Sequence, residues 1–196
     1  MKRAFDLAMS GLALIAALPV MLVIALIVRF DTPGPILFRQ MRVGLHGRPF
    51  EILKFRTMTD RPVAPGQEIT FHRDPRITRS GMFLRHWKLD ELPQLWNVFR
   101  GDMSIVGPRP ELPKYVALYS KIDREIVLSV RPGITDPASI KYRSESELLS
   151  GAQDPEKMYR EVILPDKVLL AVSYARNVSL FRDLVIIGQT LLKVLR

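Results

Sequence analysis

The stretch LAMSGLALIAALPVMLVIALIV, residues 7–28, contains no charged side chain and decides how the chain is organised. Its 22 residues would form a helix about 33 Å long, enough to cross a hydrocarbon core of about 30 Å. A cleaved signal peptide is a poorer interpretation, because its apolar core is shorter and no convincing cleavage site follows. The stretch therefore predicts a membrane helix within an anchor of residues 1–30, followed by a domain of residues 31–196.

Two topologies stay open for this helix from the residues alone. A spanning helix is the default for its length, whereas a re-entrant helix would enter and leave by the same face. Pro19 favours the re-entrant form, because it removes a backbone donor in mid-helix and kinks the chain. Basic residues at both ends, Lys2 and Arg3 before the stretch and Arg29 after it, favour two cytoplasmic ends. Neither feature decides, since spanning helices tolerate proline.

The composition points to anionic partners. The chain has 29 Lys and Arg against 20 Asp and Glu, a formal net charge of +9, which suits nucleic acid, anionic lipid or a phosphorylated substrate. The absence of cysteine excludes disulfides, Cys-ligated metal centres and Cys nucleophiles. The sequence contains no Walker-type phosphate loop, no dinucleotide-binding glycine motif and no recognised nucleic-acid-binding module. The site that uses this charge must therefore lie in other motifs.

The polypeptide after the anchor is predicted to mix helices and strands. Two strand-like runs, residues 36–43 and 49–58, flank Gly44-Leu45-His46-Gly47, which suits the turn of a β-hairpin. Helices are predicted at residues 83–88, 91–99, 112–128 and 165–175, and loops at residues 59–66 and 135–155. The predicted fold class is α+β and mainly helical, with one small hairpin.

The last segment, residues 179–195, is amphipathic. Its apolar residues recur at steps of three and four, which places them on one helical face: Leu180, Leu184, Ile187, Leu191 and Leu195. Such a face packs into the core of most globular proteins, but it also suits an amphipathic helix that lies in a membrane interface. Both interpretations stay open from the residues.

The densest cluster of reactive side chains is RHWKLDELPQ, residues 85–94. Asp90 is a candidate N-cap of the helix predicted to follow it. The helix N-terminus and the cations Arg85 and Lys88 would favour an ionised Asp90, able to attack phosphorus or bind Mg²⁺. Glu91 would add a second oxygen ligand or a proton acceptor. The alternative is a simple helix cap beside a solvated glutamate.

Further cations occur in rigid or otherwise marked segments. Arg109 lies between two prolines in GDMSIVGPRPE, residues 101–111, so its guanidinium has little entropy to lose on binding phosphate. Arg131 precedes a Pro-Gly pair, Arg143 follows an aromatic residue, and Lys54 lies in the second predicted strand. The alternative for each is a solvated side chain or a pair with a nearby carboxylate.

Five motifs occur in a fixed order along the chain. They are KRAFDL at residues 2–7, KFRTM at 54–58, LDELPQLWNV at 89–98, GDMSIVGPRP at 101–110 and RPGIT at 131–135. Together they resemble the bacterial sugar transferases, and more narrowly the monotopic phosphoglycosyl transferases. The match extends over nearly the whole chain, which is similar to the small members that consist of the catalytic domain alone.

The resemblance implies a reaction and a set of site residues. The family transfers a sugar-1-phosphate from a UDP-sugar to a polyprenyl phosphate such as undecaprenyl phosphate, releases UMP and uses Mg²⁺. By resemblance, Asp90 is the nucleophile that forms a covalent phospho-sugar intermediate, Glu91 assists it, and both carboxylates are expected at the metal. The substrate-binding residues expected are Lys54, Arg85, Arg109, Arg131, Arg143 and Asp183.

The resemblance also implies a membrane location. The anchor would be a re-entrant helix broken near Pro19, holding the domain among membrane lipids at the cytoplasmic face of the bacterial inner membrane as a monotopic protein. Downstream glycosyltransferases would be further partners, and nucleic acid would not be one. Two positions depart from the family pattern: Leu18, where many members have Ser, and Asp136, where many have Gly.

A different class of function stays open beside the enzyme. The chain could be a non-catalytic, membrane-anchored basic module that binds polyanions or a partner in glycan assembly. The intact pair of Asp90 and Glu91 favours the enzyme, because an inactive relative could lose it freely. A basic nucleic-acid-binding protein would instead show duplex binding that depends steeply on salt.

Overall fold

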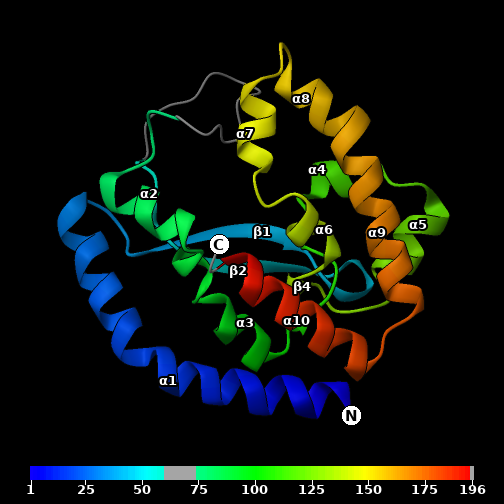
Figure 1. The fold of residues 1–196 in the computed structure, drawn as a ribbon, viewed down its shortest axis with the longest axis horizontal. Coiled ribbons are helices and arrows are strands. Elements are labelled where there is room, and N and C mark those ends of the chain that lie inside the picture. The colour runs from blue at the N-terminus through cyan, green and yellow to red at the C-terminus, as the bar shows by residue number, and fades with distance from the viewer. Residues whose placement is uncertain (60–73, 195–196) are drawn as a thin grey trace.

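Helix α1 (Lys2–Asp31) runs along one side of the molecule in a computed structural model that describes residues 1–59 and 74–194 (Figure 1). The helix is continuous through Pro19, and its axis bends between an N-terminal and a C-terminal arm (Figure 1). Proline removes a backbone donor and crowds the preceding turn, so Pro19 accounts for a bend within α1. The break expected near Pro19 is thus a bend inside an unbroken helix.

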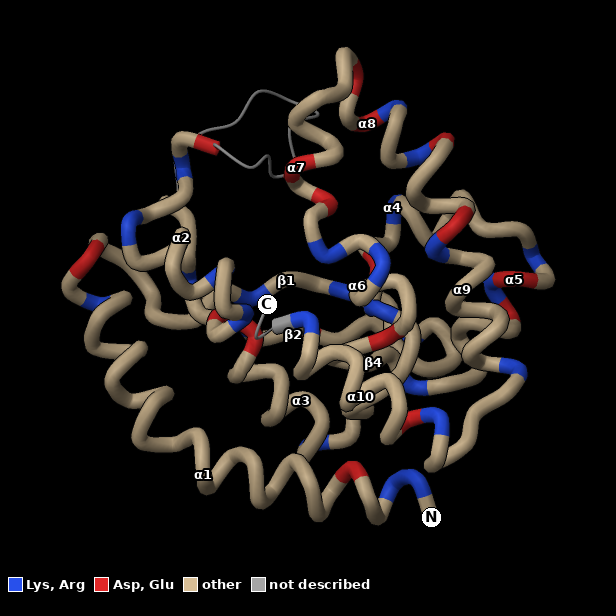
Figure 2. Tube along the Cα trace, in the orientation of Figure 1, with Lys and Arg blue, Asp and Glu red and all other residues tan. Residues whose placement is uncertain are grey.

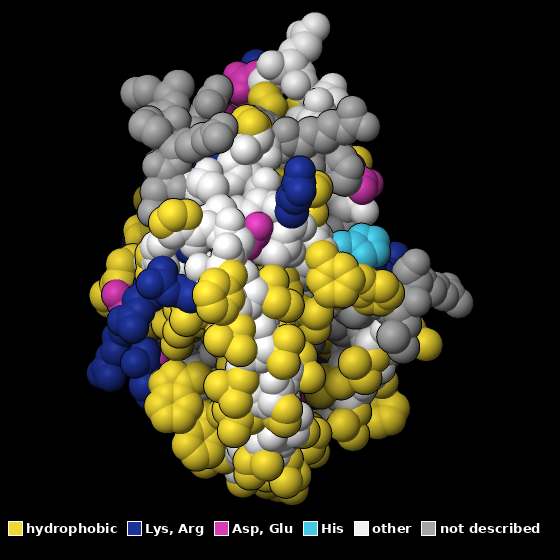
Figure 3. Space-filling model, turned by 90° about the vertical axis from the view of Figure 1, so that its left-hand side faces the viewer, with side chains coloured by type: hydrophobic (Ala, Val, Ile, Leu, Met, Phe, Trp, Pro, Cys, Tyr) yellow, Lys and Arg dark blue, Asp and Glu magenta, His cyan; other side chains and the backbone are white. Residues whose placement is uncertain are grey.

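The surface of α1 is apolar and largely uncovered. Within the described ranges, α1 alone is long and apolar enough to cross a membrane, and 11% of its most apolar window is buried. Figure 2 shows its charged residues gathered near its two ends. Figure 3 shows hydrophobic side chains covering the lower part of one face of the molecule, and those exposed on α1 include Leu12, Ile15, Leu22 and Leu26. These features support association of the chain with a membrane.

The predicted hairpin is confirmed as strands β1 (Leu37–Val43) and β2 (Pro49–Phe55). The strands are antiparallel, with Leu37 opposite Phe55 and Val43 opposite Pro49. The connection is a 3₁₀ turn (Leu45–Gly47) in which Gly47 has φ 78°, a conformation that glycine adopts readily. The buried residues Phe50 and Ile52 of β2 pack with Val98 and Met103.

The segment that carries the two adjacent carboxylates folds as α2 (Arg79–His86), a 3₁₀ turn (Leu89–Glu91) and α3 (Gln94–Arg100). Asp90 lies inside the 3₁₀ turn, and the backbone of α3 begins after Pro93 without a side-chain cap. The interpretation of Asp90 as an N-cap is therefore wrong, which removes the simple structural explanation of this carboxylate.

A pair of three-residue parallel strands, β3 (Ser104–Val106) and β4 (Gly133–Thr135), was not predicted. It brings the GPRP motif against the RPGIT motif, and the contact is very close at Gly133. A Cβ added there would lie 2.1 Å from the Gly107 nitrogen, so only glycine fits. The sheet therefore joins two of the five motifs directly.

The rest of the chain is helical. Its helices are α4 (Pro113–Val116), α5 (Lys121–Val127), α6 (Pro137–Lys141), α7 (Glu145–Ser150), α8 (Pro155–Met158), α9 (Leu164–Arg176) and α10 (Leu180–Val194), with a π-helical turn (Tyr159–Ile163) before α9. The helix predicted at 112–128 is two helices, because α4 ends at Val116 and Ser120 caps a new helix, α5. The loop predicted at 135–155 contains α6 and α7, and most of the loop predicted at 59–66 lies outside the described residues.

Helix α10 uses its two faces differently. Ile186 packs into a cluster with Val106 and the fully buried Tyr174. Leu184 and Leu191 remain exposed to 51% and 59% on the other side. The helix thus packs one face into the core, which confirms the core interpretation for Ile186. It leaves apolar side chains uncovered on another face, and an interfacial position of α10 stays a prediction.

Candidate active site

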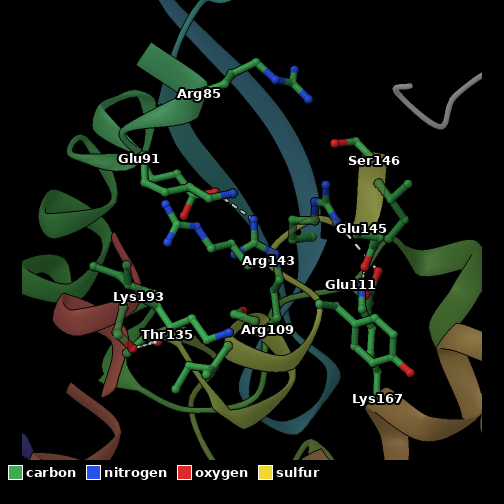
Figure 4. Close-up of a pocket in the computed structure, with 18 of the residues that line it drawn as sticks. Arg85, Glu91, Arg109, Glu111, Thr135, Arg143, Glu145, Ser146, Lys167 and Lys193 are labelled. Atoms are coloured by element: carbon green, nitrogen blue, oxygen red, sulfur yellow. Dashed lines mark hydrogen bonds and ion pairs between the residues drawn. The ribbon is translucent and has the colours of Figure 1, made fainter. Parts of the chain in front are cut away.

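A cavity of about 440 Å³ opens between the hairpin, the 3₁₀ turn of Glu91, β4, α6, α7 and α10. Its lining contains three carboxylates, Glu91, Glu111 and Glu145, and seven cations: Arg42, Arg85, Lys88, Arg109, Arg143, Lys167 and Lys193. In Figure 4, Arg109 and Arg143 lie centrally, between Glu91 on one side and Glu111 and Glu145 on the other. The predicted β-strands and the unpredicted β3–β4 pair both contribute to this arrangement.

Glu91 forms the most strongly paired group of the cavity. Its Oε1 accepts hydrogen bonds from Lys54 Nζ and Arg109 Nη2, each at 2.7 Å. Burial opposes ionisation, but the charge of Arg109, and then that of Lys54, outweighs it and holds the pKa of Glu91 well below its usual value. Glu91 is therefore a fixed anion that positions two cations from distant segments.

Asp90 is buried beside this group and behaves differently. Its side chain is 7% exposed, and its Oδ1 has no hydrogen-bond partner among the described residues. Burial raises the pKa of Asp90, although Lys54, Lys88 and Arg85 counteract the effect. Arg85 and Lys88 thus favour the ionised form of Asp90 as expected, but burial outweighs them and the net shift of its pKa is upward. Asp90 is not among the residues that line the cavity, whereas its neighbour Glu91 is.

The other expected cations divide into two groups. Arg85 from α2 and Arg143 from the segment after α6 line the cavity together with Arg109. Arg131 does not line it, and its Nε donates to the Gly101 carbonyl at 3.0 Å. The structure thus brings Lys54, Arg85, Arg109 and Arg143 to the neighbourhood of Glu91 and leaves Arg131 in the framework.

Asp183 also lies in the framework rather than at the cavity. The carboxylate is fully buried and accepts hydrogen bonds from Lys2 Nζ at 2.5 Å and Tyr174 Oη at 2.6 Å. It joins the start of α1 to α9 and α10. Asp183 thus forms a structural tie between the anchor and the domain and does not line the cavity, and its expected substrate contact stays a prediction.

A second polar wall of the cavity was not predicted from the sequence. Tyr159 Oη donates to Glu111 Oε1 at 2.8 Å, and Lys167 forms an ion pair with Glu145. Burial, reinforced by Glu111, raises the pKa of Tyr159. In the sequence, Lys167 is one of two charges at the start of the otherwise largely apolar helix predicted at 165–175, so no pattern pointed to this wall.

The carboxylate pair suits a Mg²⁺ ion shared with a phosphorylated ligand. No group of three or more His, Asp or Glu side chains that could hold a metal occurs in the part of the chain that the structure describes. Magnesium does not need such a cage, because it is often bound by one or two carboxylates, water and substrate phosphates. Asp90 Oδ1 accepts no hydrogen bond among the described residues, so Asp90 and Glu91 are the residues that would hold such an ion.

Fold and site together define a class of protein: a membrane-associated α+β domain in which several cations converge on a buried carboxylate pair. The chain belongs to the bacterial sugar transferase family, whose profile matches residues 1–196. This finding confirms the family resemblance of the five motifs.

Three relatives illustrate the match. The chain is 39% identical over 191 residues to a UDP-glucose:undecaprenyl-phosphate glucose-1-phosphate transferase of Caulobacter vibrioides, covering 96% of this chain and 67% of the relative. It is 38% identical over 195 residues to an uncharacterized sugar transferase of Bacillus subtilis, covering 100% of this chain and 87% of the relative. It is 34% identical over 199 residues to a UDP-N-acetylgalactosamine-undecaprenyl-phosphate N-acetylgalactosaminephosphotransferase of Aeromonas hydrophila, covering 99% of this chain and 43% of the relative. Two further relatives are longer, and the chain spans 35% and 40% of their lengths.

Proposed function

We propose that this protein transfers a sugar-1-phosphate from a UDP-sugar to a polyprenyl phosphate such as undecaprenyl phosphate, with release of UMP. The observation that carries the proposal is the buried pair of Asp90 and Glu91, surrounded by Lys54 and Arg109 at the edge of a cation-lined cavity. The names of the relatives support the donor and acceptor classes.

In the first step, an ionised oxygen of Asp90 attacks the phosphorus that carries the sugar. The bond from that phosphorus to the bridging diphosphate oxygen breaks, and UMP leaves with this oxygen. In the second step, a phosphate oxygen of the polyprenyl phosphate attacks the same phosphorus, and Asp90 departs as a carboxylate. The product is a polyprenyl diphosphate sugar, and the enzyme returns to its starting state. Asp90 Oδ1 is buried and accepts no hydrogen bond among the described residues, so no protein donor competes for the nucleophilic oxygen.

The surrounding residues prepare the site for this chemistry. Glu91 holds Lys54 and Arg109 next to Asp90, where negative charge builds up on the phosphoryl oxygens. Arg85 and Arg143 line the cavity and would contact the diphosphate. Bound Mg²⁺ would supply further neutralisation of the diphosphate charge. Binding and orientation of the donor therefore fall to side chains from α2, β2, the GPRP segment and the segment after α6.

The proposed membrane topology is re-entrant, because both ends of α1 are tied to the same domain. At the N-terminal end, Arg3 donates to the carbonyls of Val98 and Phe99. At the C-terminal end, Arg56 donates to the carbonyls of Thr32 and Pro33 at 2.6 and 2.8 Å. A helix that crossed the bilayer would separate these ends by the membrane thickness. We infer a monotopic protein on the cytoplasmic face, in agreement with the basic residues at both ends.

This topology would put the lipid acceptor within reach of the carboxylates. Exposed apolar side chains occur on α1, α3 and α10, and Trp96 and Phe99 of α3 are stacked and exposed to 49% and 42%. Lys193, at the end of α10, lines the cavity. A polyprenyl phosphate whose chain stays in the bilayer could thus present its phosphate at the cavity rim.

The direct test measures UMP release by the full chain in detergent or nanodiscs. A panel of UDP-sugars, including UDP-glucose and UDP-N-acetylgalactosamine, is offered with undecaprenyl phosphate, with Mg²⁺ or with EDTA. We expect UMP and a lipid-linked sugar diphosphate with at least one donor, and loss of both with EDTA. Binding of UDP-sugars without UMP release from any donor would instead support the non-catalytic binding module.

A further inference from the structure

The carboxylate of Asp136 touches two segments that each carry a cation of the cavity. The side chain is 1% exposed, and its Oδ1 accepts the Ser139 N–H at 2.7 Å as the N-cap of α6. Its Oδ2 accepts the backbone N–H of Arg109 at 3.2 Å. Helix α6 ends at Lys141, and Arg143 follows two residues later. The buried side chain of Asp136 thus contacts the backbone of Arg109 directly and is connected to Arg143 through α6.

The backbone around Arg109 has other attachments that do not depend on this side chain. Gly107 N donates to the Thr135 carbonyl at 3.1 Å, and Gly133 N donates to the Pro108 carbonyl at 3.0 Å. These bonds hold the GPRP segment against β4, so the contact between the two strands survives a substitution at position 136. The bond from Asp136 is the one that acts at Arg109 itself and ties it to α6.

The placement of these two cations matters for a ligand with two adjacent phosphates. Arg109 and Arg143 both line the cavity, and in Figure 4 they lie in its centre. Guanidinium groups bind phosphate through directional, often paired hydrogen bonds, so an error in their separation weakens both contacts. A displacement of about 1 Å is enough to lower the rate of an oriented reaction strongly.

We propose that Asp136 is a positioning residue, which sets the spacing of Arg109 and Arg143 for binding a diphosphate. The inference rests on the proposed function only in the identity of that ligand as a nucleoside diphosphate sugar. It assigns a role to a position at which this chain departs from the common pattern of its family. Asp136 itself does not line the cavity and acts through the two arginines.

The test separates the two hydrogen bonds of Asp136. In Asp136→Ser, the shorter side chain remains a good N-cap of α6 but cannot also reach the Arg109 N–H. In Asp136→Asn, the size is kept and one of the two oxygen acceptors is lost. The matched control is Asp154→Asn, because Asp154 caps the short helix α8 through Lys157 N at 3.0 Å and does not line the cavity.

Binding of UDP and of inorganic pyrophosphate by the full chain is measured by calorimetry, with thermal unfolding recorded for each variant. We expect both Asp136 variants to bind the two ligands roughly tenfold more weakly, the size of one charge-assisted hydrogen bond. The KM for the donor should rise in parallel, with a smaller change in kcat. Asp154→Asn should leave both affinities unchanged, whatever its effect on unfolding.

The inference would be overturned if Asp136→Ser kept both affinities and the donor KM, and if the only change in either variant were a lower unfolding temperature. Asp136 would then be a purely structural cap of α6. The proposed function would be refuted if the wild-type protein bound pyrophosphate but neither bound UDP nor released UMP. In that case, weaker pyrophosphate binding in Asp136→Ser would still support the positioning role. Wild-type protein that binds neither ligand would refute both.

Discussion

Arg109 Nη2 donates to Glu91 Oε1 at 2.7 Å, which connects the GPRP motif to the LDELPQ motif across the wall of the cavity. The guanidinium is 31% exposed and the carboxylate 11%, so the pair is shielded from solvent more on the glutamate side. Lys54 approaches the same oxygen at 2.7 Å. Glu91 is therefore the point at which three motifs meet, and its removal or that of a partner should be felt in both stability and activity.

Arg109→Met should leave Glu91 buried with a single cation. We expect a loss of about 2 kcal/mol in the free energy of unfolding, below the value for a fully buried pair because the guanidinium is partly exposed. Turnover should be lost as well. The control is Arg100→Met, which breaks the pair with Asp102 but removes a side chain that is 52% exposed; its cost should stay below about 1 kcal/mol. Equal effects in the two variants would contradict the importance of the Glu91 pair.

Asp183→Ala should uncouple the anchor from the domain. The substitution removes a fully buried acceptor and leaves Lys2 and Tyr174 without their shared partner, so we expect a loss of about 3 kcal/mol in unfolding free energy. Glu51→Ala, which breaks an exposed pair with Arg39, should cost less than about 1 kcal/mol. The donor KM of the folded fraction should change little. A large rise in that KM without destabilisation would contradict the structural role and indicate that Asp183 contacts the substrate.

The pH dependence of turnover should report on Asp90. Because burial raises its pKa, the ionised nucleophile forms only at a pH above the usual range of an aspartate. The acid limb of kcat/KM should therefore lie above pH 3.8, the ordinary pKa of the group. Lys54 lowers the pKa of Asp90, so Lys54→Met should move the acid limb of the residual activity to higher pH. A limb that moves to lower pH would contradict this assignment.

The re-entrant topology predicts that both ends of α1 label from the same side of the membrane. The chain contains no cysteine, so the single variants Ala4→Cys and Phe30→Cys give unambiguous positions, and both sites are exposed in the structure. A membrane-impermeant maleimide should modify neither residue in intact cells and both in inverted vesicles. Modification of Ala4→Cys in intact cells would instead establish a spanning helix.

Composition and periodicity predicted the elements whose signal lies within a single segment of the sequence. The apolar stretch, the hairpin and the last two long helices follow from composition and periodicity, and the structure contains each of them. The β3–β4 pair escaped prediction because three-residue strands carry no period, and their pairing depends on contact between segments far apart in sequence. The same reason applies to α6 and α7, whose sequences are too short to show a helical period. Helix α6 is defined at its start by the side chain of Asp136, which caps it.

The candidate site divides in the same way. Family motifs identified Glu91, Lys54 and Arg109, which the structure brings together. They could not show that Asp183 bonds to Lys2, because the two residues are 181 positions apart. Nor could a pattern of charges show that burial outweighs the nearby cations at Asp90 and raises its pKa. Those properties depend on three-dimensional packing, which single-sequence patterns do not encode.

The central claim is that Asp90 carries the phospho-sugar between donor and acceptor. The most direct measurement incubates the wild-type chain with its UDP-sugar donor and Mg²⁺ without polyprenyl phosphate, and then analyses the peptides by mass spectrometry. We predict a sugar-phosphate adduct on Asp90, with one UMP released for each adduct formed, and neither adduct nor UMP from Asp90→Asn. Near-normal UMP release by Asp90→Asn, or an adduct on another residue of the wild-type protein, would contradict the account.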